Sequence, residues 1–346
     1  MAVNNPDPRF GIAMRSPESS DVALHDRLCT QVPPPLPIGP CCGRWSGRGS
    51  WLLRKGGLTG AMFTVINKMF IARQLNRGLR LGRSLAGRGM QVTCRRQGLR
   101  WALDLDEGID LSIYLLGSYE PKTLRAYRRI LRSGAVVADI GANIGAHTLH
   151  FAHLVGATGR VHAFEPTGYA CRKLRANLAL NPALVPRVSV AQKFLVADAA
   201  ARMPASIPSS WPVAGPEPDD LHAGHLGRFE SLAEATATTA DDYFLKENLS
   251  RLDLVKLDVD GYEYAVLRGF QATLRRFRPP ILIELAPYVY DGANAAEFDE
   301  LVRLLADMGY RFSNANSGIS ISSNPADLRR KITPGGGINA LLLPTA

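Results

Sequence analysis

The feature that most constrains the fold is the stretch at residues 136–145, Val-Val-Ala-Asp-Ile-Gly-Ala-Asn-Ile-Gly. An apolar run containing Asp139 leads into two glycines four residues apart, and residues 146–151 can continue as a helix. This order predicts a strand, a tight turn and a helix. Such a turn aims backbone N–H groups and a helix N-terminus at any ligand that lies across the end of the sheet.

A second strand-like run, residues 160–164, ends at Glu165 and Pro166. Glu165 follows the glycine turn by about 20 residues, the spacing of an acid at the end of a second strand. An acid there can accept hydrogen bonds from both hydroxyls of a ribose. The sequence therefore predicts a nucleoside site.

Strand and helix patterns alternate through the rest of the chain and predict an α/β fold. Helices are expected over residues 121–131, 168–180, 263–277 and 298–308, and strands over 188–190, 194–198, 235–239, 252–257, 281–285, 310–312 and 338–343, with a hairpin over 91–105 and a turn at 241–242. We expect a Rossmann-like, mostly parallel sheet with an antiparallel C-terminal strand and helices on both faces. Residues 199–229 are rich in Pro, Ser, Gly and His, and we expect a substrate-facing excursion there.

Charge is concentrated at the N-terminal end of the chain. The first 100 residues carry 16 Lys and Arg against 4 Asp and Glu, whereas the whole chain carries 41 against 31. The body is therefore close to neutral, which disfavours a nucleic-acid partner. Five cysteines without zinc-ligand spacing fit a reducing cytoplasm. No apolar run reaches the roughly 18 residues of a transmembrane helix.

These patterns predict three regions. Residues 1–60 form a disordered Pro/Gly-rich segment, 61–100 a basic amphipathic helical arm, and 101–346 the main domain. Apolar residues alternate with arginines over 62–88. Such a helix either lies on an anionic membrane surface or packs on the domain with its arginines in water, and both interpretations stay open. The expected location is the cytoplasm, peripheral at the inner membrane surface under the first interpretation.

Acidic residues follow five of the predicted strands: Asp139, Glu165, Asp198, Asp258 with Asp260, and Glu284. The carboxyl ends of parallel strands meet at one edge of a sheet, where ligands of such folds bind. A ring of acids would repel phosphates but attract a cationic nucleoside, which favours S-adenosylmethionine over NAD or ATP. The turn also lacks the third glycine of the dinucleotide fingerprint, and the chain has no P-loop.

Several short motifs occur in a fixed order: Gly-Ser-Tyr-Glu at 117–120, the glycine turn at 137–145, Phe-Glu-Pro at 164–166, Thr-Ala-Asp-Asp-Tyr at 239–243, Val-Lys-Leu-Asp-Val-Asp-Gly-Tyr-Glu at 255–263, Val-Leu-Arg-Gly at 266–269 and Ile-Glu-Leu at 283–285. With this set, residues 101–344 resemble the FkbM-type S-adenosylmethionine-dependent methyltransferases, which have the class I methyltransferase fold. Two departures are Asp260, where the family often has Glu, and residues 199–229, which match nothing in the family pattern.

The resemblance implies O-methylation of a hydroxyl on a sugar, glycolipid, polysaccharide or related secondary metabolite, with S-adenosyl-L-methionine as cofactor. It also implies roles for individual residues. Those expected to bind the cofactor are Glu120, Asp139, Gly141, Ala142, Asn143, Gly145, Glu165, Ala197 and Asp198. Within this set, Glu165 is expected to hold the ribose and Asp198 to border the adenine.

Proton removal from a hydroxyl needs a positioned base. The candidates for substrate positioning or proton removal are Lys256, Asp258 and Asp260, and the alternative is a capping and salt-bridge set at the strand end. Glu120 closes over the cofactor or only packs its loop. His147 and His150 are three residues apart but lack a third ligand, so no metal site is expected.

Two other classes of function stay open. One is a membrane-associated module that binds S-adenosylmethionine without catalysis. The other is a nucleotide-sugar oxidoreductase on a Rossmann sheet. The sequence does not identify the acceptor hydroxyl or the oligomeric state.

Overall fold

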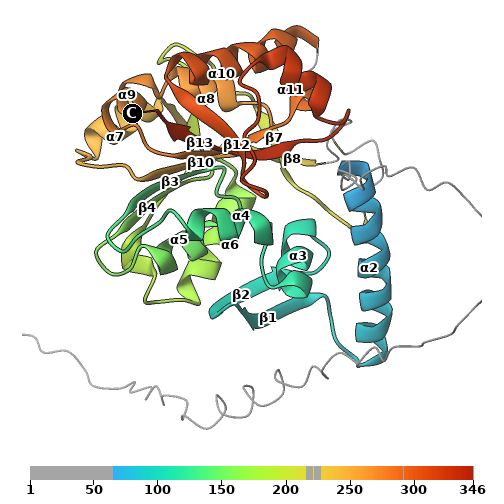
Figure 1. Ribbon diagram of the computed structural model, residues 1–346. Coiled ribbons are helices and arrows are strands. Elements are labelled where there is room, and N and C mark those ends of the chain that lie inside the picture. The colour runs from blue at the N-terminus through green and yellow to red at the C-terminus, as the bar shows by residue number, and fades with distance from the viewer. Residues whose placement is uncertain (1–64, 216–220, 222–226, 291, 346) are drawn as a thin grey trace, which may run out of the picture. The chain divides into compact units, whose positions relative to one another are not determined.

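A seven-stranded sheet forms the centre of the computed structural model (Figure 1), with the strand order β12-β13-β11-β10-β3-β4-β5. The model describes residues 65–215, 221, 227–290 and 292–345, all within one compact unit of the chain. The segment predicted to be disordered, residues 1–60, and residues 61–64 of the predicted arm lie outside the described residues.

Five neighbouring strands of this sheet are parallel, and the C-terminal strand is antiparallel to both of its neighbours. The strands are β3 Val136–Ile140, β4 Arg160–Phe164, β5 Val188–Ala191, β10 Leu254–Leu257, β11 Ile281–Leu285, β12 Tyr310–Asn314 and β13 Ile338–Pro344. The predicted mostly parallel sheet with an antiparallel C-terminal strand is confirmed. Because β3 pairs with both β4 and β10, the strand order reverses beside it, and ligands bind at such a switch point.

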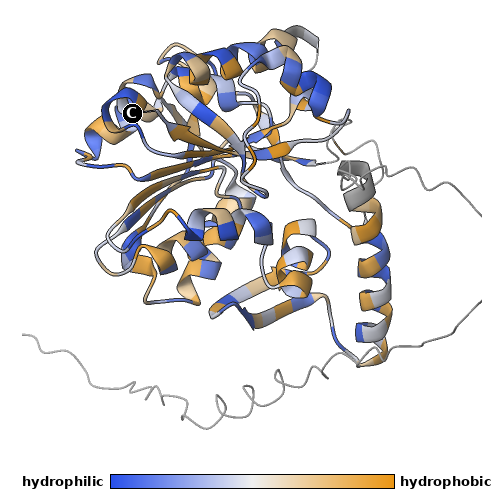
Figure 2. Ribbon diagram, viewed as in Figure 1, coloured by the Kyte–Doolittle hydropathy of each residue, from blue (hydrophilic) through white to orange (hydrophobic). Residues whose placement is uncertain are grey.

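Helices cover both faces of the sheet, as predicted. One face carries α4 Pro121–Arg128, α5 Thr148–Leu154 and α6 Gly168–Ala179; the other carries α7 Ala240–Lys246, α8 Glu263–Arg268, α9 Gln271–Phe277, α10 Ala295–Asp307 and α11 Pro325–Lys331. Successive strand residues point to opposite faces, so Val137 packs in one core and Ala138 in the other. The inner strands are therefore hydrophobic on both sides, as Figure 2 shows.

The N-terminal elements share one hydrophobic core with the sheet. They are α2 Val65–Leu85, the antiparallel hairpin of β1 Gln91–Arg96 and β2 Leu99–Asp104, and α3 Gly108–Leu116. Met69 and Trp101 are buried in the same core as Val137. The buried amide of Asn76 donates to the Leu105 carbonyl at 2.7 Å and to Asp106 Oδ1 at 2.9 Å, which fixes α2 on the domain. None of the described helices is long and apolar enough to cross a membrane.

Two expected features differ, and both differences involve Asp241. The expected turn at residues 241–242 is the first turn of α7, because Thr239 Oγ1 accepts the Asp242 N–H at 3.0 Å and caps the helix. The single helix expected over 263–277 is divided at Gly269, where a Cβ would lie 2.2 Å from the Val196 carbonyl oxygen. The Asp241 carboxylate then caps α9 by accepting the N–H groups of Ala272 and Thr273.

Smaller elements complete the fold beside the sheet. They are β6 Lys193–Leu195 paired with β9 Thr236–Thr238, β7 Ser206–Ser210 paired with β8 Arg228–Ser231, and the short 3₁₀ helices η1 Val185–Arg187, η3 Pro287–Val289 and η4 Gly292–Asn294. The region 199–229, which shows no periodicity in the sequence, therefore contains β7. Its residues 216–220 and 222–226 lie outside the described part of the chain.

Asn177 offers a test of how the hairpin supports the glycine turn. Its buried side chain accepts the Ala102 N–H at 2.8 Å and donates to the Ile144 carbonyl at 3.0 Å. Asn177→Ala should lower the free energy of unfolding by about 2 kcal/mol or more, because buried backbone partners lose their hydrogen bonds. Asn181 makes the same kind of amide contacts to Arg100 but in a more exposed place, so Asn181→Ala should cost about 1 kcal/mol or less. Urea unfolding of both variants measures this, and equal losses would contradict the assignment.

Candidate functional site

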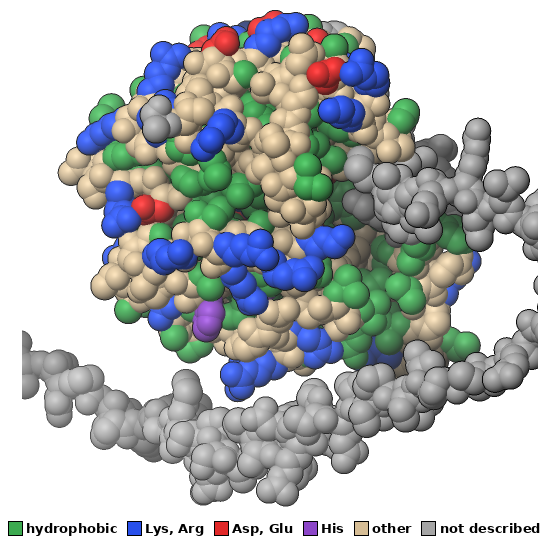
Figure 3. All heavy atoms as spheres, viewed as in Figure 1, with side chains coloured by type: hydrophobic (Ala, Val, Ile, Leu, Met, Phe, Trp, Pro, Cys, Tyr) green, Lys and Arg blue, Asp and Glu red, His purple; other side chains and the backbone are tan. Residues whose placement is uncertain are grey.

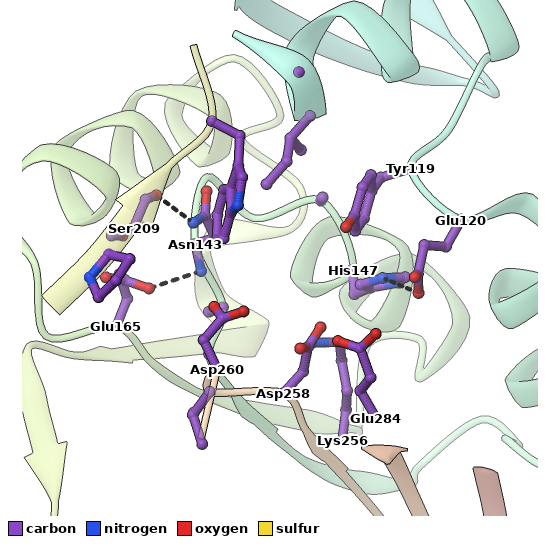
Figure 4. A pocket seen from close by; sticks show the side chains of 18 of the residues that line it. Tyr119, Glu120, Asn143, His147, Glu165, Ser209, Lys256, Asp258, Asp260 and Glu284 are labelled. Atoms are coloured by element: carbon purple, nitrogen blue, oxygen red, sulfur yellow. Dashed lines mark hydrogen bonds and ion pairs between the residues drawn. The ribbon is translucent and has the colours of Figure 1, made fainter. Parts of the chain in front are cut away.

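A cavity of about 500 Å³ lies beyond the carboxyl ends of β3, β4 and β10 (Figure 4). This is within the range of about 300–1,000 Å³ typical of small-molecule sites. Its polar lining comes from the turn after β3 and from residues at the ends of β4, β10 and β11. Of the residues predicted for the site, those that line it are Glu120, Gly141, Ala142, Asn143, Glu165, Lys256, Asp258 and Asp260.

The glycine turn is built by close approaches that exclude a side chain. Gly141 has φ +82°, and a Cβ there would lie 1.8 Å from the Asp258 carbonyl oxygen. Gly145 has φ +88°, and a Cβ there would lie 2.6 Å from a Leu174 methyl group. Both positions therefore require glycine. Gly141 lines the cavity, whereas Gly145 packs behind it against α6.

The backbone donors of this turn are all used within the protein, which differs from the expectation. The N–H groups of Gly141 and Ala142 donate to the Phe164 carbonyl, and that of Gly145 donates to Ala142. The Asn143 N–H donates to Glu165 Oε2 at 2.9 Å, and the Ile144 N–H to Asn143 Oδ1. The turn therefore offers the cavity no row of free donors of the kind that phosphates require.

Glu165 has one remaining acceptor position at the cavity. Its Oε1 accepts two hydrogen bonds from Thr167, from the N–H at 2.9 Å and from Oγ1 at 2.6 Å. Among the residues that the structure describes, only Asn143 donates to its Oε2. A carboxylate oxygen can accept two hydrogen bonds, so Oε2 has room for one more. Burial raises the pKa of Glu165 above its ordinary value, while the three donors favour the ionised form.

A buried lysine stands among carboxylates at the other side of the cavity. Lys256 Nζ lies 3.1 Å from Asp258 Oδ2, and Glu284 and Glu120 point toward the same place (Figure 4). Burial opposes the charge on Lys256, but Asp258, Asp139 and Glu120 together raise its pKa above the ordinary value. The ammonium group is therefore charged. It is one cation among several carboxyl groups.

Asp260 sits in a strained loop after β10. Its φ is +50°, and the following Gly261 has φ +102°. The buried Glu263 carboxylate holds this loop by accepting the N–H groups of Val259 and Gly261 and the hydroxyl of Tyr290. Burial first, and then the nearby Asp258, raise the pKa of Asp260 well above its ordinary value.

Glu120 enters the cavity from the loop before α4. Its φ is +45°, and Asn339 Nδ2 donates to its Oε1 at 2.9 Å, so β13 fixes the side chain. Burial and Asp258 raise the pKa of this carboxyl. Its Oε2 lies 3.8 Å from His147 Nε2. Burial, with Lys256 and His150, lowers the pKa of His147 well below its ordinary value, so the ring is neutral near pH 7 and the contact is not an ion pair.

Besides Gly145, three other predicted cofactor residues do not line the cavity: Asp139, Ala197 and Asp198. The Asp139 side chain is fully buried, and its Oδ2 accepts the Thr148 hydroxyl at 2.6 Å. Ala197 and Asp198 lie beyond β6, and the exposed Asp198 accepts the N–H of Ala200. The strand expected over residues 194–198 already ends at Leu195, which carries the acid past the cavity.

The cavity also contains residues that the sequence did not single out. Its apolar lining includes residues of α2, α3, β6 and β7 and the residue just after β7: Ile71, Leu75, Ile109, Leu115, Leu116, Phe194, Leu195, Ile207 and Trp211. Asn143 Nδ2 donates to the Ser209 carbonyl at 2.9 Å, which ties β7 to the glycine turn. The only sequence signal for β7 was the length of the region without periodicity, which was expected to face the substrate.

The sheet order and the cavity define the class I S-adenosylmethionine-dependent methyltransferase fold. Residues 139–312, half of the chain, match the family model described as the methyltransferase FkbM domain. The chain therefore belongs to the FkbM methyltransferase family, whose cofactor is S-adenosylmethionine.

Among curated proteins, the chain is similar to the 31-O-demethyl-FK506 methyltransferase FkbM of Streptomyces tacrolimicus, at 31% identity over 163 residues. The match covers 41% of this chain and 61% of that relative. Among solved structures, it is similar to methyltransferase FkbM from Methylobacillus flagellatus, at 16% identity and TM-score 0.39, covering 64% of this chain and 47% of that one. It is also similar to an S-adenosylmethionine-dependent O-methyltransferase from Thermotoga maritima, at 11% identity and TM-score 0.35, covering 76% and 81%.

The histidines beside the turn are core residues. His147 lies beneath Tyr119 and Tyr127, and His150 packs near Trp101. Within the residues that the structure describes, no three His, Cys, Asp or Glu side chains are grouped as metal ligands. Burial lowers the pKa of His150 to about 4, and Arg128 and His153 add to this effect.

This buried histidine predicts a pH dependence of stability. An unfolded histidine has a pKa of about 6.5, so below that pH the unfolded chain binds a proton that the folded chain does not. Stability is therefore lost as the pH falls from about 6.5 toward 4, by about 3 kcal/mol for His150. In His150→Phe this contribution should be absent, so the stability of the variant should fall less steeply than that of the wild type between pH 6.5 and 4.

Urea unfolding at several pH values measures the effect. Titration of the His150 ring by NMR gives an independent reading that does not depend on the variant. A native pKa near 6.5 would contradict the prediction.

Proposed function

We propose that this protein transfers the methyl group of S-adenosylmethionine to a hydroxyl on a sugar, glycolipid, polysaccharide or related secondary metabolite. The observation that carries the proposal is the polar half of the cavity. It offers carboxylate acceptors around one buried lysine, and the donors of its glycine turn are already used. Such a site favours a cationic nucleoside over a phosphate-rich one.

The proposed donor site begins at the glycine turn. Glu165 Oε2, with its one remaining acceptor position, takes a ribose hydroxyl. Residues 141–143 form the wall beside it, and Asp139 supports the turn from behind by bonding Thr148. Phe194 and Leu195 provide an apolar surface for the adenine, in place of Ala197 and Asp198.

The charged groups fit the other end of the donor. Glu120, Asp258 and Asp260 line the cavity, and mutual repulsion with burial raises the pKa values of Glu120 and Asp260. A cation placed among them relieves that repulsion. When bound, S-adenosylmethionine supplies a methyl group on a positively charged sulfur.

The acceptor hydroxyl needs alignment and a place for its proton. Holding the reacting atoms in line contributes roughly 7 to 11 kcal/mol to such a displacement. Asp260 is the proposed base, because a raised pKa brings a carboxylate closer to the operating pH. The hydroxyl proton passes to its carboxylate as the oxygen gains the methyl group. Lys256 holds Asp258 in place through the contact of 3.1 Å between Nζ and Oδ2.

The relative from Streptomyces tacrolimicus supports oxygen as the acceptor atom. Its name, 31-O-demethyl-FK506 methyltransferase, places the transferred methyl group on an oxygen. This chain spans 61% of that relative, so the acceptor itself is not carried over.

Glu165→Gln tests the ribose assignment. The amide has no negative charge and keeps only one oxygen, which cannot accept from both Asn143 and Thr167 as the carboxylate does. A ribose hydroxyl therefore loses either its acceptor or the charge that strengthens the hydrogen bond. Affinity for S-adenosylmethionine should fall at least about tenfold, the effect of one charge-assisted hydrogen bond. Calorimetry measures it, with the exposed Glu234→Gln as the matched control. Unchanged affinity in Glu165→Gln would remove Glu165 from the donor site.

Asp260→Asn tests the proposed base. The variant keeps the shape of the loop but cannot take up the proton, so turnover should fall on the order of 100-fold, a larger change than that in donor affinity. In the wild type, kcat should rise with pH as the Asp260 carboxyl ionises. This rise should be absent in the variant. Labelled S-adenosylmethionine with fractionated cell glycolipids and polysaccharides provides the assay. Wild-type turnover in the variant would contradict the role, and donor binding without transfer by the wild type to any hydroxyl acceptor would contradict the function.

A further inference from the structure

Helix α2 exposes an apolar stripe on the side opposite to its buried contacts. Met69 and Asn76 attach the helix to the domain. Phe70, Leu81 and Leu85 are between 62% and 82% exposed. They lie 11 and 4 residues apart, about three turns and one turn of helix, so they share one side. A stripe of this kind on a surface helix usually marks an interaction site.

Cations accompany the stripe, and α2 contains no acidic residue. Arg73 and Arg77 lie on the flank of the helix next to it, and neither forms an ion pair with any described residue. Helix α4 and the residues just after it expose five more cations, Lys122, Arg125, Arg128, Arg129 and Arg132. In Figure 3, Lys and Arg side chains cross the middle of the face while hydrophobic side chains gather toward α3 and α2.

The apolar surface continues into the mouth of the cavity. Ile71 and Leu75, on the other flank of the α2 stripe, line the cavity and are also exposed. Leu115 and Leu116 at the end of α3 do the same from the opposite side. The entrance to the polar site is therefore an apolar rim that joins the α2 stripe.

We propose that α2 and the end of α3 dock on an anionic lipid bilayer, with the rim of the cavity facing the lipid. A helix with an apolar stripe, flanking arginines and no acids binds anionic interfaces by burial of the stripe and attraction of the arginines. The rim then receives a hydroxyl carried by a lipid, a corollary that rests on the proposed function. Docking itself does not depend on methyl transfer.

A lipid surface accounts for these observations better than a protein partner. A bilayer can bury a long apolar stripe without a complementary groove. Its negatively charged surface is wide enough to attract the cations of both α2 and α4. It also explains why the stripe joins the mouth of the cavity, since an amphiphilic acceptor reaches the site from the same surface.

Sedimentation of the full chain with vesicles tests the docking. Binding should be strong to equal amounts of phosphatidylcholine and phosphatidylglycerol, weak to phosphatidylcholine alone, and weaker in high salt. The first 64 residues also carry arginines, which can attract anionic vesicles on their own. The double variant Leu81→Ser and Leu85→Ser leaves the net charge of the chain unchanged, so a loss of binding reports the apolar stripe alone. The variant should reduce binding to the anionic vesicles at least about tenfold. Leu245→Ser, at an equally exposed leucine on α7, is the matched control and should bind as the wild type.

Calorimetry with S-adenosylmethionine separates this proposal from the proposed function. The Leu81→Ser and Leu85→Ser variant should bind the donor with unchanged affinity, which also shows that it is folded. Equal binding of that variant and the wild type to anionic vesicles would overturn the docking, as would wild-type binding to both vesicle types alike. A third result would assign the stripe to a second copy of the chain. In that case the wild type self-associates and binds no vesicles, and the variant does not self-associate. None of these results depends on methyl transfer.

Discussion

The buried ammonium group of Lys256 makes the acidic edge of the sheet possible. A carboxylate buried without a partner is costly, and Asp139, Asp258 and Glu120 all lie near this one cation. The parallel pairing of β10 with β3 brings these groups together, because the close approach of Gly141 to Asp258 lets two strand ends meet without side chains between them. One lysine does not neutralise all the acids, so the pKa values of Glu120 and Asp260 stay raised. The cavity therefore holds an excess of negative charge that a cationic ligand can balance.

The shape of the cavity divides it into two chemical halves. The half at the strand ends carries the carboxylates and the glycine turn, and the other half is bounded by apolar side chains of α2, α3 and β7. The first half belongs to the sheet, which the family shares. The second half comes largely from α2 and α3, which lie outside the matched residues 139–312, and from β7, which lies within them. We therefore propose that these apolar elements, and not the strand ends, select the acceptor.

The sequence predicted the sheet well because its signals are local. The bounds of β3, β4 and β11 follow directly from apolar runs that end in an acid or a turn. The errors came from contacts between distant residues. Asp241 looked like a turn residue but caps α9, and Gly269 ends α8 because the Val196 carbonyl lies against it. The turn donors were expected to face the ligand, yet four of them are used within the fold. The Phe164 carbonyl accepts two, the Glu165 carboxylate accepts one, and Asn143 Oδ1 accepts one. Ala197 and Asp198 do not line the cavity, and β6 ends at Leu195, before the end of the strand expected over residues 194–198.

Proton release on donor binding tests the central claim, that the cavity is built for a cation. Calorimetry in buffers of different ionisation enthalpy, at about pH 6.5, gives the number of protons released when the full chain binds S-adenosylmethionine. A cation among carboxylates of raised pKa lowers those pKa values, so binding should release protons. S-adenosylhomocysteine lacks the sulfonium charge, and it should release fewer protons and bind more weakly. Equal proton release and equal affinity for the two ligands, or proton uptake with S-adenosylmethionine, would contradict the account.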